Sequence, residues 1–255
     1  MATIESYPQN GFWREFALTP VETETLRSAV QQNFARRLDD CGLGHLGLTF
    51  DTYHRAVEDA THGQLWPRHE RRLTGETLAF IRNTALMRRL EDRFGALEIT
   101  NEEGESEPEV TWRLVRPGKA QDVGPLHADA WFWDLNGWPI PEGKVCVKIW
   151  SLLHGDAGQC GLYVVPGSHR GGGAAYETVE KDGIRKPVLV EESLAHAPRL
   201  LDMSEGESVV FDYGLLHGGS VTASARARVS FEFTVFADAR RYAEIRDGAP
   251  VHTGA

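Results

Sequence analysis

This sequence of 255 residues has few cysteines and fewer basic than acidic residues, and each of these features excludes a class of protein. The three cysteines, Cys41, Cys146 and Cys160, are odd in number and form no CxxC pair. This argues against a disulfide framework and for a reducing compartment. The 27 basic residues are outnumbered by 37 acidic ones, for a net charge of −10, so no nucleic-acid groove or anionic membrane surface is expected. A small-molecule partner is expected instead.

Long apolar runs are also missing. No segment reaches the roughly 20 apolar residues of a membrane span, and the opening MATIESYPQNGFWREF has no basic stretch followed by an apolar one, as a signal peptide would. We therefore expect a cytoplasmic protein. Hydrophobic residues make up 41% of the chain, which is enough for one well-buried core. Because no linker is visible, we expect a single domain over residues 1–255.

Residues 1–95 are expected to be mostly helical and to pack on the core. Thr19 and Pro20 supply an N-cap and a first-turn proline before VETETLRSAVQQNFARRLDD, in which acids come early and arginines late. A second helix is expected over residues 52–61. A third is expected over residues 74–94, where apolar residues recur roughly at helical spacing and a glycine follows.

Residues 96–240 change to short alternating or β-branched runs separated by Gly, Pro, Asp and Asn, which is typical of a β-sandwich or barrel. Candidate strands cover seven segments: 96–100, 109–116, 144–153, 162–166, 187–190, 207–213 and 227–236. We predict a mainly β fold with flanking helices, whose core is a double-stranded β-helix, the jelly roll of cupin-like proteins.

The last of these strands has two distinct faces. One face is apolar, with Val229, Phe231, Phe233 and Val235, and the other is polar, with Arg228, Ser230, Glu232 and Thr234. The polar face either lies in solvent or lines the inside of a barrel that serves as a wet active site. Lys148 and Trp150 similarly share one face of the segment 144–153.

A histidine and an aspartate two residues apart occur twice, at His127-Ala128-Asp129 and at His154-Gly155-Asp156. On an extended chain, residues at this spacing project to the same side. Such a pair supplies two of the three ligands in the 2-His-1-carboxylate set that holds Fe(II) on one face. The second pair lies in LLHGDAGQCG, whose Asp and Gly indicate a turn, so we expect a capping or solvated role there.

The first pair is the better candidate. Aromatic residues suited to a dry cavity follow it, namely Trp131, Phe132 and Trp133. The third ligand must come from a distant strand, and His217 follows 90 residues later (217 − 127 = 90), at the end of a predicted strand. Cys146 and Cys160 are expected to be buried thiols rather than ligands, since this type of iron prefers imidazole and carboxylate.

Three blocks make the chain resemble the phytanoyl-CoA dioxygenase family of Fe(II)- and 2-oxoglutarate-dependent oxygenases. They are His127-Ala128-Asp129, the segment LYVVPGSHR at 162–170, and Phe211-Asp212 through His217 to Arg228. Together they cover about residues 109–236. The resemblance implies that His127, Asp129 and His217 bind iron. It also implies that Arg228, eleven residues after His217 (228 − 217 = 11), holds the 5-carboxylate of 2-oxoglutarate.

Further candidates follow from the same resemblance. A hydroxyl residue often stands two positions after the distal histidine, but here Gly219 does, which makes the next residue, Ser220, a candidate second contact to 2-oxoglutarate. Arg116 is a candidate for the 1-carboxylate or for the substrate, with a plain surface arginine as the equal alternative. The candidates for the substrate pocket are Trp131, Trp133 and Lys148.

The implied reaction splits dioxygen, decarboxylates 2-oxoglutarate to succinate and CO2, and hydroxylates or otherwise oxidises a C–H bond of a small metabolite, with ascorbate as a helper. Related halogenases lack the acidic ligand that Asp129 supplies. Two alternatives stay open: a non-catalytic metal-binding jelly roll, and a cupin-type isomerase or epimerase with His217 or His154 as the base. Residues 168–200 are expected to form a lid or specificity element. Substrate identity and oligomeric state are not readable from the sequence.

Overall fold

The structure is a computed structural model that describes residues 4–100, 107–171, 174–181, 184–190, 194 and 196–247. Its α-helices are α1 (Tyr7–Asn10), α2 (Pro20–Asp40), α3 (Phe50–Tyr53), α4 (Asp59–Leu65), α5 (Gly75–Arg82), α6 (Ala85–Phe94), α7 (Asp129–Asn136) and α8 (Ala239–Arg246). None of the helices in this described part has both the length and the apolarity needed to cross a membrane.

The strands form two main antiparallel sheets and a hairpin. In chain order they are β1 (Phe12–Ala17), β2 (Arg72–Leu73), β3 (Glu98–Ile99), β4 (Val110–Val115), β5 (Lys144–His154), β6 (Gly161–Val164), β7 (Tyr176–Lys181), β8 (Ile184–Leu189), β9 (Arg199–Asp202), β10 (Glu207–Asp212), β11 (His217–Gly219) and β12 (Arg228–Asp238). The large sheet has the order β1-β10-β5-β12-β4-β2, with β3 also paired to β12. The small sheet has the order β11-β6-β9, and β7 pairs with β8.

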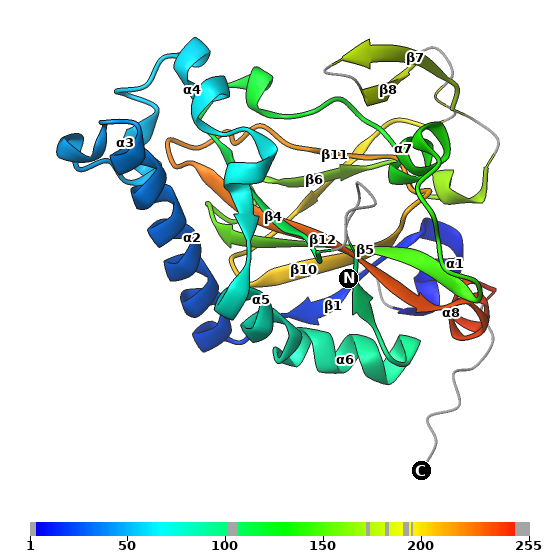
Figure 1. The fold of residues 1–255 in the computed structure, drawn as a ribbon. Coiled ribbons are helices and arrows are strands. Elements are labelled where there is room, and N and C mark those ends of the chain that lie inside the picture. Colours follow the sequence, from blue (N-terminus) through cyan, green and yellow to red (C-terminus); the bar gives the residue numbers. More distant parts are fainter. Residues whose placement is uncertain are drawn as a thin grey trace.

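The two main sheets face each other (Figure 1). Side chains from β5 and β10 of the large sheet meet side chains from β6 and β9 of the small sheet in one buried cluster, which includes Trp150, Leu152, Leu162, Val164, Leu201, Val209 and Phe211. The opposite face of the large sheet packs on the helices, because Leu26, Val30 and Phe34 of α2 share a core with Phe231 and Phe233 of β12. The predicted jelly-roll core with outer helices is confirmed.

The central strands β5 and β12 set the register of the site. Thr234 lies opposite Lys148, and Glu232 lies opposite Trp150. Because side chains alternate along a strand, the apolar residues of β12 enter the core beneath the helices. Arg228 and Glu232 of its polar face line a cavity between the sheets. The interpretation of this face as the inside of a barrel is therefore confirmed at these two positions.

Helix α2 begins where the sequence predicts. The Thr19 hydroxyl accepts a hydrogen bond from the Glu22 amide, and the Glu22 carboxylate accepts one from the Thr19 amide, which completes a capping box. The same carboxylate accepts a bond from the Ala85 amide at the start of α6. The predicted helix over residues 74–94 is instead two helices, because Thr84 caps α6 through the Met87 amide.

Other predicted boundaries are wrong in ways that tertiary contacts explain. The helix expected over 52–61 is replaced by the short helices α3 and α4. Strand β1, within the lead expected to be mostly helical, pairs with β10 far along the chain, so no local signal marks its role.

The hairpin β7–β8 lies within the expected lid segment 168–200. It packs on α7, where the rings of Trp131 and Tyr176 are 4.7 Å apart. Residues 172–173, 182–183, 191–193 and 195 of that segment lie outside the described residues, and its role as a lid stays a prediction.

Candidate metal centre

His127, Asp129 and His217 form the one group of metal-ligating side chains found among the described residues, with ligand atoms all within 4.8 Å of one another. The backbones of His127 and His217 are joined by two hydrogen bonds of 2.9 Å, one in each direction. Asp129 is the first residue of α7. The expectation that His127 and Asp129 share an extended strand is therefore wrong, because the chain turns into a helix at the aspartate. The first turn of a helix favours a carboxylate there.

Local hydrogen bonds fix both imidazoles in the orientation that a metal needs. Nδ1 of His127 lies 2.9 Å from the carbonyl oxygen of Pro125, and Nδ1 of His217 lies 2.9 Å from that of Leu215. A carbonyl oxygen only accepts, so each Nδ1 carries the proton and each Nε2 keeps its lone pair for a ligand. Ser168 of the PGSHR segment supports this arrangement, since its hydroxyl accepts a 2.8 Å bond from the Leu216 amide beside His217.

The Asp129 carboxylate lies between three cationic or potentially cationic groups. Its Oδ1 is 3.5 Å from His127 Nε2, and its Oδ2 is 3.9 Å from His217 Nε2 and 3.5 Å from Lys148 Nζ. Burial alone would raise the pKa of Asp129, but Lys148, His217 and His127 together hold it well below its usual range. Burial lowers the pKa of His217 to about 4. The site thus presents an ionised carboxylate and a neutral His217.

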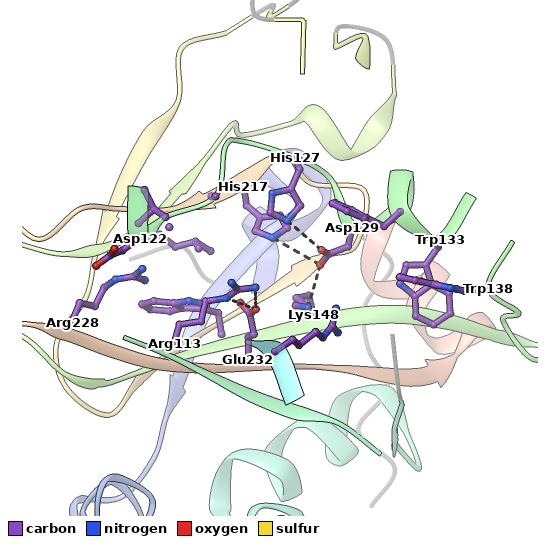
Figure 2. A pocket seen from close by; sticks show the side chains of 18 residues that line it. Arg113, Asp122, His127, Asp129, Trp133, Trp138, Lys148, His217, Arg228 and Glu232 are labelled. Carbon is purple, nitrogen blue, oxygen red and sulfur yellow. Dashed lines mark hydrogen bonds and ion pairs between the residues drawn. The ribbon is translucent and has the colours of Figure 1, made fainter. Parts of the chain in front are cut away.

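The triad opens into a cavity of about 140 Å³ between the two sheets. Figure 2 shows Arg228 at one end, Trp133 and Trp138 at the other, and the triad between them above Lys148 and Glu232. His127 is partly exposed, with 24% of its side chain accessible, so small molecules can reach the centre. Two imidazoles and one carboxylate on one side of an open cavity suit mononuclear Fe(II) with positions left for further ligands.

Arg228 is the charged group whose burial most requires a ligand. It is 1% exposed, its Nε and Nη1 have no hydrogen-bond partner among the described residues, and burial lowers its pKa to about 10. Its guanidinium lies 5.5 Å from the ring centre of Trp150. A buried cation with open donors is costly unless an anion pairs with it. The cavity end at Arg228 therefore fits a carboxylate.

Position 219 holds glycine where the family often has a hydroxyl residue, and it lies against Arg228. A Cβ built on Gly219 would lie 2.8 Å from Nη2 of Arg228, closer than a real side chain allows. Ser220, the proposed substitute, does not line the cavity. Its hydroxyl instead bonds the amide and the carbonyl of Gly161 and so ties β11 to β6.

Arg116 is also absent from the cavity lining. It is neither a surface arginine nor placed to meet a ligand there. It is fully buried, and its guanidinium donates to both oxygens of Asp122 and to Asp59 at 2.6 to 2.9 Å. Since Asp122 lines the cavity, Arg116 shapes the wall from behind.

Helix α7 divides the aromatic candidates. Trp133 and Phe132 line the cavity, whereas Trp131 packs outward on Tyr176. Residues two apart point the same way on a strand but about 200° apart on a helix, so the helix separates Trp131 from Trp133.

Lys148 lines the cavity as proposed. Trp138 and the ion pair between Arg113 and Glu232, 2.6 Å apart, also line it. Sequence reasoning singled out neither Trp138 nor Arg113, although Glu232 stood on the polar face of β12.

The second His-x-Asp pair forms no metal site. His154 Nε2 lies 2.9 Å from Asp51 Oδ1, and Arg226 donates to His154 Nδ1 at 3.1 Å. Asp156 pairs with Arg226 at 2.9 Å. Arg226, two residues before Arg228, therefore belongs to a partly exposed ion cluster outside the cavity lining.

Comparison with known proteins agrees with this geometry. The sequence profile of phytanoyl-CoA dioxygenase (PhyH) matches residues 10–230, and no curated protein matches the chain. Among solved structures, EvdO2 from Micromonospora carbonacea var. aurantiaca, complexed with 2-oxoglutarate, is 14% identical with a TM-score of 0.54, covering 92% of this chain and 89% of that one. The epimerase SnoN, in complex with Fe3+, alpha ketoglutarate and nogalamycin RO, has the same identity and TM-score, covering 92% and 82%. At this identity both show the fold alone.

Fold and site together define a jelly-roll oxygenase of the mononuclear iron type. The chain belongs to the phytanoyl-CoA dioxygenase family, whose profile covers most of its length. It is therefore a 2-oxoglutarate-dependent oxidoreductase, with His127, Asp129 and His217 able to hold the iron.

Proposed function

We propose that the chain oxidises a C–H bond of a small-molecule metabolite, by hydroxylation or another outcome, and releases succinate and CO2. The observation that carries the proposal is the position of Arg228. This buried guanidinium with open donors lies in the same cavity as the triad, as a dicarboxylate that reaches both would require.

The bound iron and 2-oxoglutarate supply the activation of dioxygen, and the chain supplies placement. His127 and His217 offer the Nε2 atoms that their backbone partners leave open. Asp129 offers a carboxylate oxygen. Arg228 would hold the distal carboxylate of 2-oxoglutarate with its open donors, which would fix the orientation of the co-substrate.

Aromatic side chains next to these residues would keep the centre dry. Trp150 lies beneath the Arg228 guanidinium, and Phe211 packs on the His217 ring at 4.6 Å. Phe132 meets the His127 ring edge-on at 5.5 Å. These apolar surfaces exclude water from the reacting atoms and leave the substrate the aromatic end of the cavity.

The decisive experiment measures succinate formed from 2-oxoglutarate by the purified protein with Fe(II), ascorbate and oxygen, while a metabolite library is screened for stimulation. We expect one Fe(II) per chain and slow turnover even without substrate. His127→Ala is the matched negative control. A folded, iron-loaded protein that forms no succinate would contradict the proposal and favour a non-catalytic metal-binding role. A cupin-type isomerase would convert its substrate without consuming 2-oxoglutarate.

A further inference from the structure

A buried carboxylate outside the cavity lies shortly before a metal ligand in the sequence. Asp212 is the last residue of β10 and is 6% exposed, and His217 follows five residues later (217 − 212 = 5). Oδ1 of Asp212 accepts a 2.7 Å hydrogen bond from the Gly214 amide, and its backbone carbonyl accepts one of 2.9 Å from the Leu215 amide. An aspartate that bonds the amide two residues further on fixes a tight turn. Asp212 therefore fixes the start of the turn that leads to His217.

Carbonyl groups of this turn support two of the three metal ligands. The Leu215 carbonyl accepts the hydrogen bond from Nδ1 of His217 at 2.9 Å. The Tyr213 carbonyl accepts a 2.9 Å bond from the amide of Ala130, which follows Asp129 in the first turn of α7. A change in the turn would therefore move the His217 ring and the start of α7 relative to each other.

Two buried tyrosines from opposite ends of the sequence hold the other oxygen of Asp212. The Tyr242 hydroxyl of α8 donates to Oδ2 of Asp212, and the Tyr7 hydroxyl of α1 donates to Tyr242 at 3.4 Å. The two rings meet edge to face with centres 6.2 Å apart, where α1 and α8 lie side by side (Figure 1). Burial raises the pKa of Tyr242 well above its usual value, so this phenol keeps its proton and serves as a donor.

Packing alone does not account for these polar groups. Phenylalanine at both tyrosine positions would fill nearly the same space, and a buried carboxylate is costly unless hydrogen bonds satisfy it. The hydroxyls are explained by the carboxylate that they satisfy, and the carboxylate is explained by the turn that it fixes. A buried network in which each member has a partner also makes its surroundings rigid. The element that this network makes rigid is the one that supports His217 and α7.

We propose that Asp212 is a positioning residue for the iron centre, and that Tyr242 and Tyr7 act on the centre by holding its carboxylate. This inference rests on the proposed function to the extent that both need the same centre. Groups that orient a metal ligand from outside the coordination sphere contribute roughly 10- to 100-fold to metal affinity or activity. The network should therefore be measurable in metal binding itself, before any turnover.

The test measures Mn(II) binding to the full chain without 2-oxoglutarate, from the electron paramagnetic resonance signal of free Mn(II). Tyr242→Phe removes the hydroxyl that donates to Asp212 and keeps the ring. We expect its Mn(II) affinity to fall roughly tenfold, and we expect the visible spectrum of the Co(II)-loaded protein to change because the His217 ring is less firmly oriented. Tyr7→Phe, which is one hydrogen bond further from the turn, should have a smaller effect.

Variants of Asp212 test the carboxylate itself. Asp212→Ala should weaken Mn(II) binding at least as much as Tyr242→Phe. Asp212→Asn keeps an oxygen that can accept from the Gly214 amide, so it should restore part of the affinity. If Asp212→Ala does not fold, the comparison of Asp212→Asn with Tyr242→Phe carries the same test.

Tyr53→Phe is the matched control for the loss of a buried hydroxyl. Tyr53 is fully buried, its hydroxyl accepts a 2.9 Å hydrogen bond from Nε1 of Trp66, and it lies outside the cavity lining. This variant should unfold at a lower temperature than the wild type but keep its Mn(II) affinity and Co(II) spectrum. Thermal unfolding of every variant without metal separates a loss of global stability from a loss at the centre.

Two results would overturn the proposal. The first is wild-type Mn(II) affinity in Tyr242→Phe and in both Asp212 variants. The second is an equal loss of affinity in Tyr53→Phe, which would assign the effect to global stability. Failure of the proposed function is distinguishable, because it would appear as wild-type protein that binds Mn(II) but forms no succinate when loaded with Fe(II).

Discussion

The two His-x-Asp sequences of this chain have the same spacing and opposite chemistry. At the first, Nδ1 of His127 donates a hydrogen bond to the Pro125 carbonyl oxygen, and Nε2 is left open toward the cavity. At the second, Nε2 of His154 donates to Asp51 and Nδ1 accepts from Arg226. Both nitrogens of that ring are therefore occupied, and no lone pair remains for a metal.

The carboxylates divide in the same way. Asp129 meets a second histidine brought in by β11, whereas Asp156 pairs with Arg226. The spacing alone does not make a metal centre. A metal centre also requires the hydrogen bond that orients each ring and a third ligand, which β11 supplies at the first motif.

Replacing the histidine of each motif should give the largest difference in iron content and activity between the two regions. His127→Ala is expected to lose bound iron and all measurable succinate formation, because a ligand of the centre is gone. His154→Ala should keep both, since its ring holds only a partly exposed ion cluster. Metal analysis and succinate assays on the two variants decide the matter. The reverse pattern would show that the wrong motif has been assigned.

The arginines come next, because Arg228 and Arg226 stand two residues apart and serve different regions. Arg228→Ala should weaken 2-oxoglutarate binding by roughly 2 to 5 kcal/mol, the cost of losing a desolvated charged pair, with little change in iron content. Arg228→Lys should recover only part, since an ammonium cannot make the two-pronged contact. Arg226→Ala should leave the 2-oxoglutarate dependence of succinate formation near that of the wild type. An affinity loss confined to Arg226→Ala would refute the role of Arg228.

Two glycines sharpen the contrast further. Gly219→Ala places a Cβ 2.8 Å from Nη2 of Arg228, so the guanidinium must shift, and 2-oxoglutarate affinity should fall by roughly 1 kcal/mol, about fivefold. Gly155→Ala meets Cys160 Sγ at 2.8 Å and has a φ of +150°, so it should lower the free energy of unfolding by about 1 to 3 kcal/mol. Titration of 2-oxoglutarate and thermal unfolding should separate the pair. Equal effects of both variants on co-substrate affinity would contradict the assignment.

The smallest effect is expected at Asp51. Burial alone would raise its pKa, but hydrogen bonds from His154 and the Ala227 amide lower it below the usual value. Asp51 therefore stabilises the fold above about pH 4, the unfolded pKa, and this contribution is lost as the pH falls through the folded pKa. Asp51→Asn should cost less than about 1 kcal/mol at neutral pH, because solvent screens the cluster. The unfolding curves of variant and wild type should differ at pH 7 and converge below pH 4, once the pH has fallen through the folded pKa of Asp51.

The sequence was sufficient for the local features of this site. Turn-forming residues around His154 and aromatic residues after Asp129 separated the two motifs, and strand alternation placed Arg228 and Glu232 on one face. The position of His217 at the end of a predicted strand made it the candidate third ligand, and the family resemblance implied the same residue. What could not be predicted depends on distant partners. Arg116 forms an ion pair with Asp59, which lies in an earlier part of the sequence, and no feature of the sequence near Arg116 predicts that contact.

The second limit is the ambiguity of short aromatic runs. The segment DAWFWDLN fits either an extended or a helical chain, and the choice decides whether Trp131 and Trp133 share a side. Only the completed fold shows the helix, which begins at Asp129 and ends at a left-handed Gly137 with φ of +63°.

The backbone bridge between His127 and His217 also bears on when the chain can hold metal. It joins residues 90 positions apart (217 − 127 = 90), and closing a loop of that length costs conformational entropy that contacts between near neighbours avoid. A chain emerging from the ribosome would carry His127 and Asp129 long before His217 is made. The complete ligand set exists only when the segment at His127 has paired with β11, so a tight site for a redox-active metal forms late in folding.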